Sequence, residues 1–211
     1  MLKQIDLQRI LFLDIETVSA YPNYAEMPEV WQNLWADKTR FQREKEEKTP
    51  EEFYPERAGI LAEFGKIVCI SCGLFSKYGI ANREFRLKSF YGDDEKILLE
   101  EFADMLNKHF GEPSHMLCAH NGKEFDFPYL SRRMLVNKIE LPRALDTAGK
   151  KPWEVAHLDT LELWKFGDYK HYTSLKLLCA LFNIPTPKDD MDGSQVGPIF
   201  WAEKDLARIA T

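Results

Sequence analysis

The sequence contains no hydrophobic run long enough to cross a membrane. The longest, residues 67–75, has nine residues, whereas a membrane-spanning helix needs about 20. The first six residues, MLKQID, also lack the apolar core of a secretory signal peptide. We therefore expect a cytoplasmic protein that does not insert into a membrane.

Cysteine is also scarce. With four cysteines among 211 residues and no secretory segment, we expect reduced thiols rather than a disulfide framework. Cys69 and Cys72 form a CxxC pair inside an apolar stretch that is typical of a β-strand. Since residues three apart on a strand point to opposite faces, the pair is disfavoured as a zinc or redox site.

An excess of positive charge, which favours direct binding to nucleic acid, is absent. The chain has 28 Lys and Arg against 34 Asp and Glu, a formal net charge of −6. We compared the charges of four consecutive segments, residues 1–66, 67–119, 120–176 and 177–211. Only residues 120–176 are net positive, with ten basic against eight acidic residues. An acidic protein can still bind phosphates if divalent metal ions sit on its carboxylates, because the ions then dominate the local field.

The composition fits one packed domain. Hydrophobic residues make up 45% of the chain and aromatic residues 13%, which excludes the disordered and collagen-like classes. A length of 211 residues is within the size of a single core. We expect one domain over residues 1–211.

Short apolar runs alternate with helical patterns along the chain. Strands are expected at residues 10–15, 67–75, 83–91, 115–120 and 155–159, the second and third forming a hairpin. Residues 19–65 are expected to form a charged helical insertion, and later helices to begin at Asp93 or Asp94, at 125 and at Thr173 or Ser174. The sum is an α/β fold, a mixed sheet of about five strands with helices on both faces.

Two carboxylates lie near the end of the first expected strand. Asp14 and Glu16 are two positions apart, so both project from one face while Ile15 points into the opposite layer. Their repulsion would be relieved by a hard divalent cation, and oxygen-only ligands suit Mg²⁺ or Mn²⁺ rather than zinc. The alternative is an ordinary polar strand end.

A second polar cluster runs from the fourth expected strand into a helix. The Asn121-Gly122 turn leads to Phe125 and Asp126. In the first helical turn, Asp126 can project over the strand edge beside Asp14. The alternative is that Asp126 only stabilises the helix N-terminus.

Together these two clusters resemble a known family. Asp14-Ile15-Glu16-Thr17 resembles the first motif, and Asn121 with Phe125-Asp126 the second, of the DEDD-type 3′-5′ exonucleases, whose fold is RNase H-like. The sequences HNGKEFD at residues 120–126 and HLDT at 157–160 most resemble the predicted exonucleases related to the proofreading domain of B-family DNA polymerases.

The resemblance implies a chemistry and its residues. Asp14, Glu16 and Asp126 would bind two Mg²⁺ or Mn²⁺ ions, and Thr17, Asn121 and Phe125 would hold the 3′-terminal nucleotide. The expected reaction is hydrolysis of the terminal phosphodiester of single-stranded nucleic acid, DNA rather than RNA, releasing nucleoside monophosphates. A non-catalytic nucleic-acid-binding module on the same fold and an RNase H-like endonuclease are the alternatives.

One part of the family pattern is missing. Its third motif places a fourth carboxylate four residues after a Tyr or five after a His on the last helix, and no such pair is found. Residues 203–211 have a helical pattern with no stop signal. We therefore expect truncation within the last helix, with the motif following Thr211 in the natural protein. This chain would then carry three of the four site carboxylates and could be inactive; a naturally short protein is the alternative.

Three further features are less specific. Asp159 is either a residue that supports the site or a turn former. Residues 188–197 are expected to form an acidic surface turn. Aromatic and basic residues alternate in one region and are expected either to guide single-stranded nucleic acid or, for about half of the rings, to lie in the core: Trp153, Trp164, Phe166, Tyr169 and Tyr172 with Lys150, Lys151, Lys165, Lys170 and His171.

Overall fold

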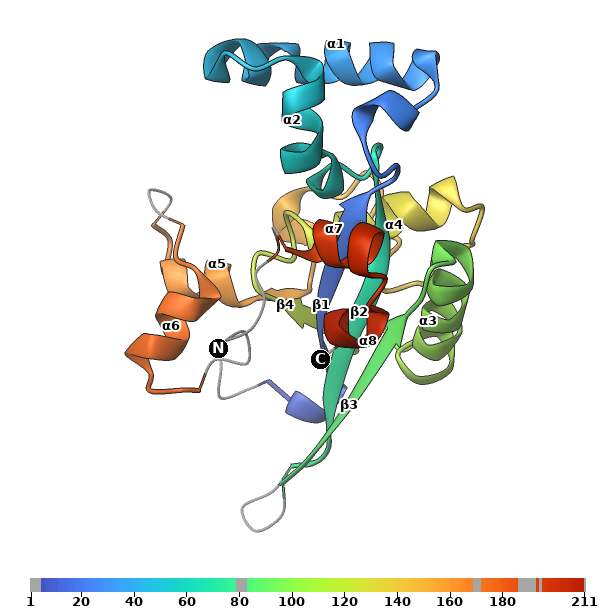
Figure 1. The fold of residues 1–211 in the computed structure, drawn as a ribbon. Helices are drawn as coiled ribbons and strands as arrows, with labels where there is room; N and C mark the ends of the chain where they lie inside the picture. Colours follow the sequence, from blue (N-terminus) through green and yellow to red (C-terminus); the bar gives the residue numbers. More distant parts are fainter. Residues whose placement is uncertain (1–4, 79–82, 169–171, 186–192, 194, 211) are drawn as a thin grey trace.

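The computed structural model describes residues 5–78, 83–168, 172–185, 193 and 195–210. Its centre is a five-stranded sheet in the order β3-β2-β1-β4-β5 (Figure 1). The strands are β1 Ile10–Ser19, β2 Gly65–Tyr78, β3 Arg83–Tyr91, β4 Met116–Ala119 and β5 Leu158–Asp159. The expected mixed sheet is confirmed, because β1, β2 and β3 pair antiparallel whereas β1, β4 and β5 pair parallel.

Four of the five strands differ in length from the sequence expectation, and two of these are β2, which is longer at Gly65–Tyr78, and β4, which is shorter at Met116–Ala119. β1 continues through Ser19, because its second half pairs with the start of β2 at Gly65. β5 has two residues, since Pro152–Glu154 form a 3₁₀ helix before it. The expected hairpin of β2 and β3 is confirmed by antiparallel pairing from Cys69–Tyr91 to Tyr78–Arg83.

One face of the sheet carries the larger core. Leu11, Leu13 and Ile15 of β1 pack there with residues of α3 (Glu95–His109) and α4 (Asp126–Val136). The two helices are joined by a buried ion pair, in which Arg133 donates to both carboxylate oxygens of Glu95 at 2.9 and 2.6 Å. This pair fixes α4, and so the residue at its first position, relative to the sheet.

The opposite face is covered by the last helices. Val18, Val68 and Cys69 contact a second cluster from α7 (Val196–Pro198), a π-helix (Ile199–Glu203) and α8 (Leu206–Ile209), which lie over β1 and β2 in Figure 1. Val68 and Cys69 share this face because the register shifts by one residue between Glu16 and Thr17, which is a β-bulge on β2. Helices on both faces are thus confirmed.

The end of the chain differs from the expected continuous helix over residues 203–211. The π-helix ends at Glu203, and Lys204 has a left-handed backbone with φ 55°. Asp205 then caps the separate short helix α8 by accepting from the Arg208 amide. The helix is broken because Asp205 bonds to the backbone of a new first turn.

The helical insertion forms its own small core. α1 (Glu29–Glu46) and α2 (Pro50–Arg57) lie beyond one end of the sheet in Figure 1. Buried side chains of this cluster are Met27, Trp35, Phe53, Tyr54, Ala58 and Phe64. The remaining helices, α5 (Thr160–Lys165) and α6 (Leu175–Leu181), follow β5. Within the described residues, no helix is long and apolar enough to cross a membrane.

Candidate active site

The two acids of the first motif lie on the central strand. Asp14 is opposite Ser71 and Glu16 opposite Cys69 on β2. Ile15, between them, is buried in the larger core, so alternation turns both carboxylates toward the other face of the sheet. Asp14 is exposed and Glu16 is half-buried. The expected orientation of this pair agrees with the structure.

Asp126 reaches the same strand from 111 residues away. It is the first residue of α4, it is 3% exposed, and its Oδ1 accepts a hydrogen bond from the Ile15 amide at 3.2 Å. The amide that it binds belongs to the residue between Asp14 and Glu16. The fold therefore brings the first and second motifs together.

The electrostatics of Asp126 favour a positively charged ligand. Burial, and to a smaller extent the negative charge of Asp14, raises the pKa of its carboxyl to about 7. A cation between the two carboxylates would relieve both effects. The donors are oxygen atoms, which fits Mg²⁺ or Mn²⁺. Across the described residues, however, no three His, Cys, Asp or Glu side chains already converge on a point that could hold a metal ion.

The Asn121 turn is shaped by its own backbone. Asn121 has a left-handed conformation with φ 63°, which asparagine tolerates better than most residues. Its carbonyl oxygen accepts from the amides of Glu124 and Phe125 at 3.2 and 3.0 Å. Gly122 is packed tightly, because a Cβ there would lie 2.4 Å from the Cβ of Ala119. The turn places Asn121 directly before the helix that carries Asp126.

Asp159 holds this turn in place. It is 3% exposed and accepts from the amides of Asn121 (2.9 Å), Lys123 (3.1 Å) and Leu161 (2.9 Å). The same carboxylate thus caps α5 and anchors the second motif. The cap could be read from the sequence, since Asp159 directly precedes a helical stretch, but the bonds to the turn could not.

Phe125 and Thr17 both lie beside Tyr129, which the sequence analysis did not identify. The Phe125 ring is half-buried against the larger core, 5.3 Å from the Tyr129 ring. The Tyr129 hydroxyl donates to the Gly59 carbonyl at 2.7 Å and shares a hydrogen bond with Thr17. The only sequence signal for Tyr129 is its helical spacing of four from Phe125. The roles of Thr17, Asn121 and Phe125 toward a nucleotide stay predictions.

The two cysteines of the CxxC pair are buried on opposite faces of the sheet. Cys72 faces the larger core and Cys69 the opposite cluster. Both are buried free thiols, and burial raises the pKa of Cys72 to about 11. Opposite faces and protonated thiols do not support a zinc or redox site.

The aromatic residues after the second motif are mostly on the surface. Trp153 is 77% exposed and Phe166 90% exposed, and Trp164 and Tyr172 are also exposed. The expectation that about half of the rings lie in the core is therefore wrong for these four, because none of the core clusters formed by the described residues includes them. Tyr169, Lys170 and His171 lie outside the described residues, as does most of the expected turn at 188–197.

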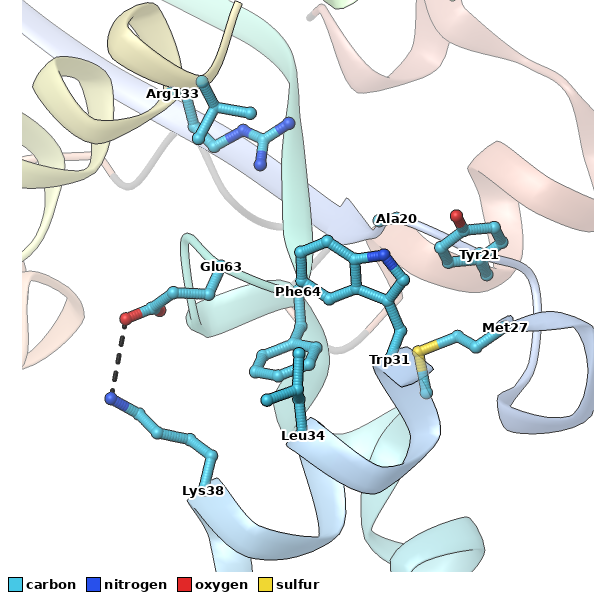
Figure 2. A pocket seen from close by; sticks show the side chains of 10 residues that line it. Ala20, Tyr21, Met27, Trp31, Leu34, Lys38, Glu63, Phe64 and Arg133 are labelled. Atoms are coloured by element: carbon cyan, nitrogen blue, oxygen red, sulfur yellow. Dashed lines mark hydrogen bonds and ion pairs between the residues drawn. The ribbon is translucent and has the colours of Figure 1, made fainter. Parts of the chain in front are cut away.

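A separate apolar pocket of about 530 Å³ lies between the insertion and the far end of α4 (Figure 2). Trp31, Leu34 and Phe64 form much of its wall, and the Lys38–Glu63 ion pair spans 3.5 Å at one side. No residue of the two motifs lines this pocket.

Comparison with known proteins gives a family and a fold. Residues 60–211, more than half of the chain, match the family described as "Predicted 3'-5' exonuclease related to the exonuclease domain of PolB". The family B DNA polymerase of the archaeon Pyrobaculum calidifontis aligns over 94% of this chain with a TM-score of 0.55 and 15% identity. This likeness confirms the RNase H-like fold.

Two exonuclease I structures are also similar. The E. coli enzyme, solved with single-stranded DNA and zinc, aligns over 94% of this chain at 12% identity and TM-score 0.45. A product-bound exonuclease I aligns over 95% at 11% identity and TM-score 0.45. This chain spans 22% of the polymerase and 40% and 45% of the two exonuclease chains. No curated protein sequence matches it.

Proposed function

Because the chain belongs to the family of predicted 3′-5′ exonucleases related to the exonuclease domain of PolB, we propose that it removes nucleoside monophosphates from a single-stranded 3′ end, DNA in preference to RNA. The observation that carries the proposal is the hydrogen bond from the Ile15 amide to Asp126. It joins the two acidic motifs at one place on the central strand.

Asp14, Glu16 and Asp126 are the residues that would hold two Mg²⁺ or Mn²⁺ ions. Bound there, the ions would supply an activated water and charge stabilisation for the leaving 3′ oxygen. Asp126 is protonated over half of the time below about pH 7 without metal, so ion binding requires its proton to leave. Asn121 and Phe125, which precede Asp126 in the second motif, would hold the terminal nucleotide together with Thr17, which follows Glu16 on β1.

The test is degradation of a 5′-labelled single-stranded oligonucleotide. With Mn²⁺ or Mg²⁺ we expect a ladder of products shortened from the 3′ end, absent in EDTA and absent in Asp14→Asn. Asp37→Asn is the matched control, since Asp37 is an exposed acid on α1 and its substitution makes the same change in charge. Cleavage without metal, or an Asp14→Asn variant as active as Asp37→Asn, would contradict the proposal.

A binding module without catalysis is the second candidate. It is favoured by the absence of a ready three-acid cluster among the described residues. A binding module holds the oligonucleotide in EDTA, loses affinity as salt rises, and is not weakened by Asp14→Asn. An endonuclease is separated from both by a circular single-stranded substrate, which an exonuclease cannot degrade.

A further inference from the structure

Two large rings stand almost fully in solvent beside the second motif. Trp153 is 77% exposed and Phe166 90% exposed. Phe166 also has a left-handed backbone, φ 47° and ψ 34°, which a bulky residue rarely adopts. Exposed apolar groups that lie together mark interaction sites more often than scattered ones do. We call Trp153, Phe166, Lys151 and Lys165 the aromatic surface.

The rings border two adjoining hollows. One, of about 610 Å³, is lined by Trp153, Phe166 and Asp159 among others. The second, of about 620 Å³, is lined by Lys165 and Gly167 among others. Lys123, Trp153 and Glu162 line both hollows, so the two form one depression, and Lys123 joins it to the turn that carries Asn121.

Hydrogen bonds join the segment that carries the aromatic surface to that turn. Asp159, between Trp153 and Phe166 in sequence, binds the amides of Asn121 and Lys123. Two residues earlier, His157 accepts from the Leu117 amide at Nδ1 and donates from Nε2 to the Ala144 carbonyl. The chain between Trp153 and Phe166 is therefore anchored to the turn that precedes Asp126.

The charge around the rings is mixed: the hollows are lined by Lys123 and Lys165 and by four acids, Glu124, Asp159, Glu162 and Asp168. Asp159 and Glu162 are already bonded within the protein. Residues 120–176 are the net positive segment of the chain, and two of their acids, Asp126 and Asp159, are buried. Lys151 Nζ lies 5.4 Å from the centre of the Trp153 ring, and Lys165 lines the depression. The Glu162 carboxylate is already paired with Lys123 at 2.7 Å. Rings with lysines beside them are the pattern that stacks bases and neutralises phosphates of a single strand.

We propose that the aromatic surface binds single-stranded nucleic acid on the 5′ side of the terminal nucleotide, with bases stacked on Trp153 and Phe166 and phosphates near Lys151 and Lys165. This rests on the proposed function, because the 3′ end is taken to lie at Asn121 and Asp126. A strand long enough to pass from the turn along the depression gains affinity that a short one lacks. Because every base has a stacking face, the surface is tolerant of sequence.

The experiment measures binding of 5′-fluorescein-labelled oligothymidylates of 3 and 12 nucleotides to the 211-residue chain in EDTA, by fluorescence anisotropy. Trp153→Ala and Phe166→Gly each remove one ring. Glycine accepts positive φ without strain, so Phe166→Gly does not threaten folding. Phe41→Ala is the matched control, since Phe41 is 75% exposed on α1 and the Arg40 guanidinium lies 5.0 Å from its ring.

The expected result is weaker binding of the dodecamer, by about 5- to 150-fold for each lost ring, with the trinucleotide unaffected and Phe41→Ala within two-fold of the parent. If Trp153→Ala and Phe166→Gly bind the dodecamer as tightly as Phe41→Ala does, the proposal is overturned. The rings would then be a surface for a protein partner. If binding depends on the rings but the protein has no nuclease activity, the proposed aromatic surface is supported and the proposed exonuclease function is contradicted. If the protein has nuclease activity but binding does not depend on the rings, the exonuclease function is supported and the aromatic surface is contradicted.

Discussion

The Asp126 carboxylate lies 3.2 Å from the Ile15 amide, although the two residues are 111 positions apart. Through this bond a buried acid at the start of α4 meets the strand that carries Asp14 and Glu16. The Asp14 charge and burial act in the same direction on the pKa of Asp126. The site is therefore electrostatically unfavourable for the protein alone, and this has measurable consequences.

Asp126 is expected to make stability fall as pH rises. Its pKa is about 7 in the folded state against an ordinary value of 3.8, so the folded state holds the proton more tightly than the unfolded state does. The free energy of unfolding therefore decreases as the pH rises from about 4 to 7. Asp126→Asn cannot titrate and should not show this decrease. Its free energy of unfolding, relative to the parent, should rise by roughly 2 to 4 kcal/mol from pH 4 to pH 8, measured by urea unfolding. An equal difference at both pH values would show that Asp126 does not titrate in this range.

Divalent metal is expected to offset the loss of stability that Asp126 causes at high pH. In metal-free buffer at pH 8, addition of Mn²⁺ should raise Tm, because an ion that binds only the folded state stabilises it by mass action. The increase should be smaller at pH 5.5, where Asp126 is mainly protonated. Asp14→Asn should abolish it and Asp37→Asn should not. A rise in Tm that is the same in all three proteins would indicate metal binding elsewhere.

Asp159 is expected to contribute more to the free energy of unfolding than an ordinary helix cap does. Asp159→Ala leaves three buried or half-buried amides without their acceptor, at a cost of about 3 kcal/mol or more. Asp94→Ala is the comparison, since Asp94 caps α3 at the surface through two amides and should cost about 1 kcal/mol. Urea unfolding measures both, and hydrogen exchange should accelerate at residues 121–123 only in the Asp159 variant. If the two substitutions lower the free energy of unfolding by similar amounts, Asp159 acts only as a helix cap.

Gly65 is expected to be required beside Tyr129. A Cβ at Gly65 would lie 2.2 Å from the Tyr129 hydroxyl oxygen and 2.9 Å from the carbonyl oxygens of Gly59 and Val18. Gly65→Ala should therefore lower the free energy of unfolding by about 1 to 3 kcal/mol. Gly92→Ala, where a Cβ meets nothing within 4 Å, should be within about 0.5 kcal/mol of the parent. Calorimetric Tm values compare the two, and a tolerated Gly65→Ala would mean that Tyr129 can move away.

The candidate site was only partly accessible from sequence. Asp14 and Glu16 could be placed on one face of a strand because alternation is a local property. That Asp126 is buried against Ile15 follows from packing of α4 on the sheet, and the Glu95–Arg133 pair that fixes α4 joins residues 38 positions apart. Tyr129 was missed for the same reason, since its partners Gly59 and Thr17 are close only in the folded chain.

The sequence by itself determined the local structure of this protein: the central strand, the hairpin, and the helix starts at Asp94 and Ser174, whose side chains accept from amides two or three residues ahead. Such interactions span a few residues and need no other segment. Tertiary structure alone decided which rings are covered. Trp35 is buried within the insertion and Trp153 is exposed beside the second motif, although both are tryptophans in charged segments. Burial depends on which distant segment packs over a side chain, and that is a property of the whole fold.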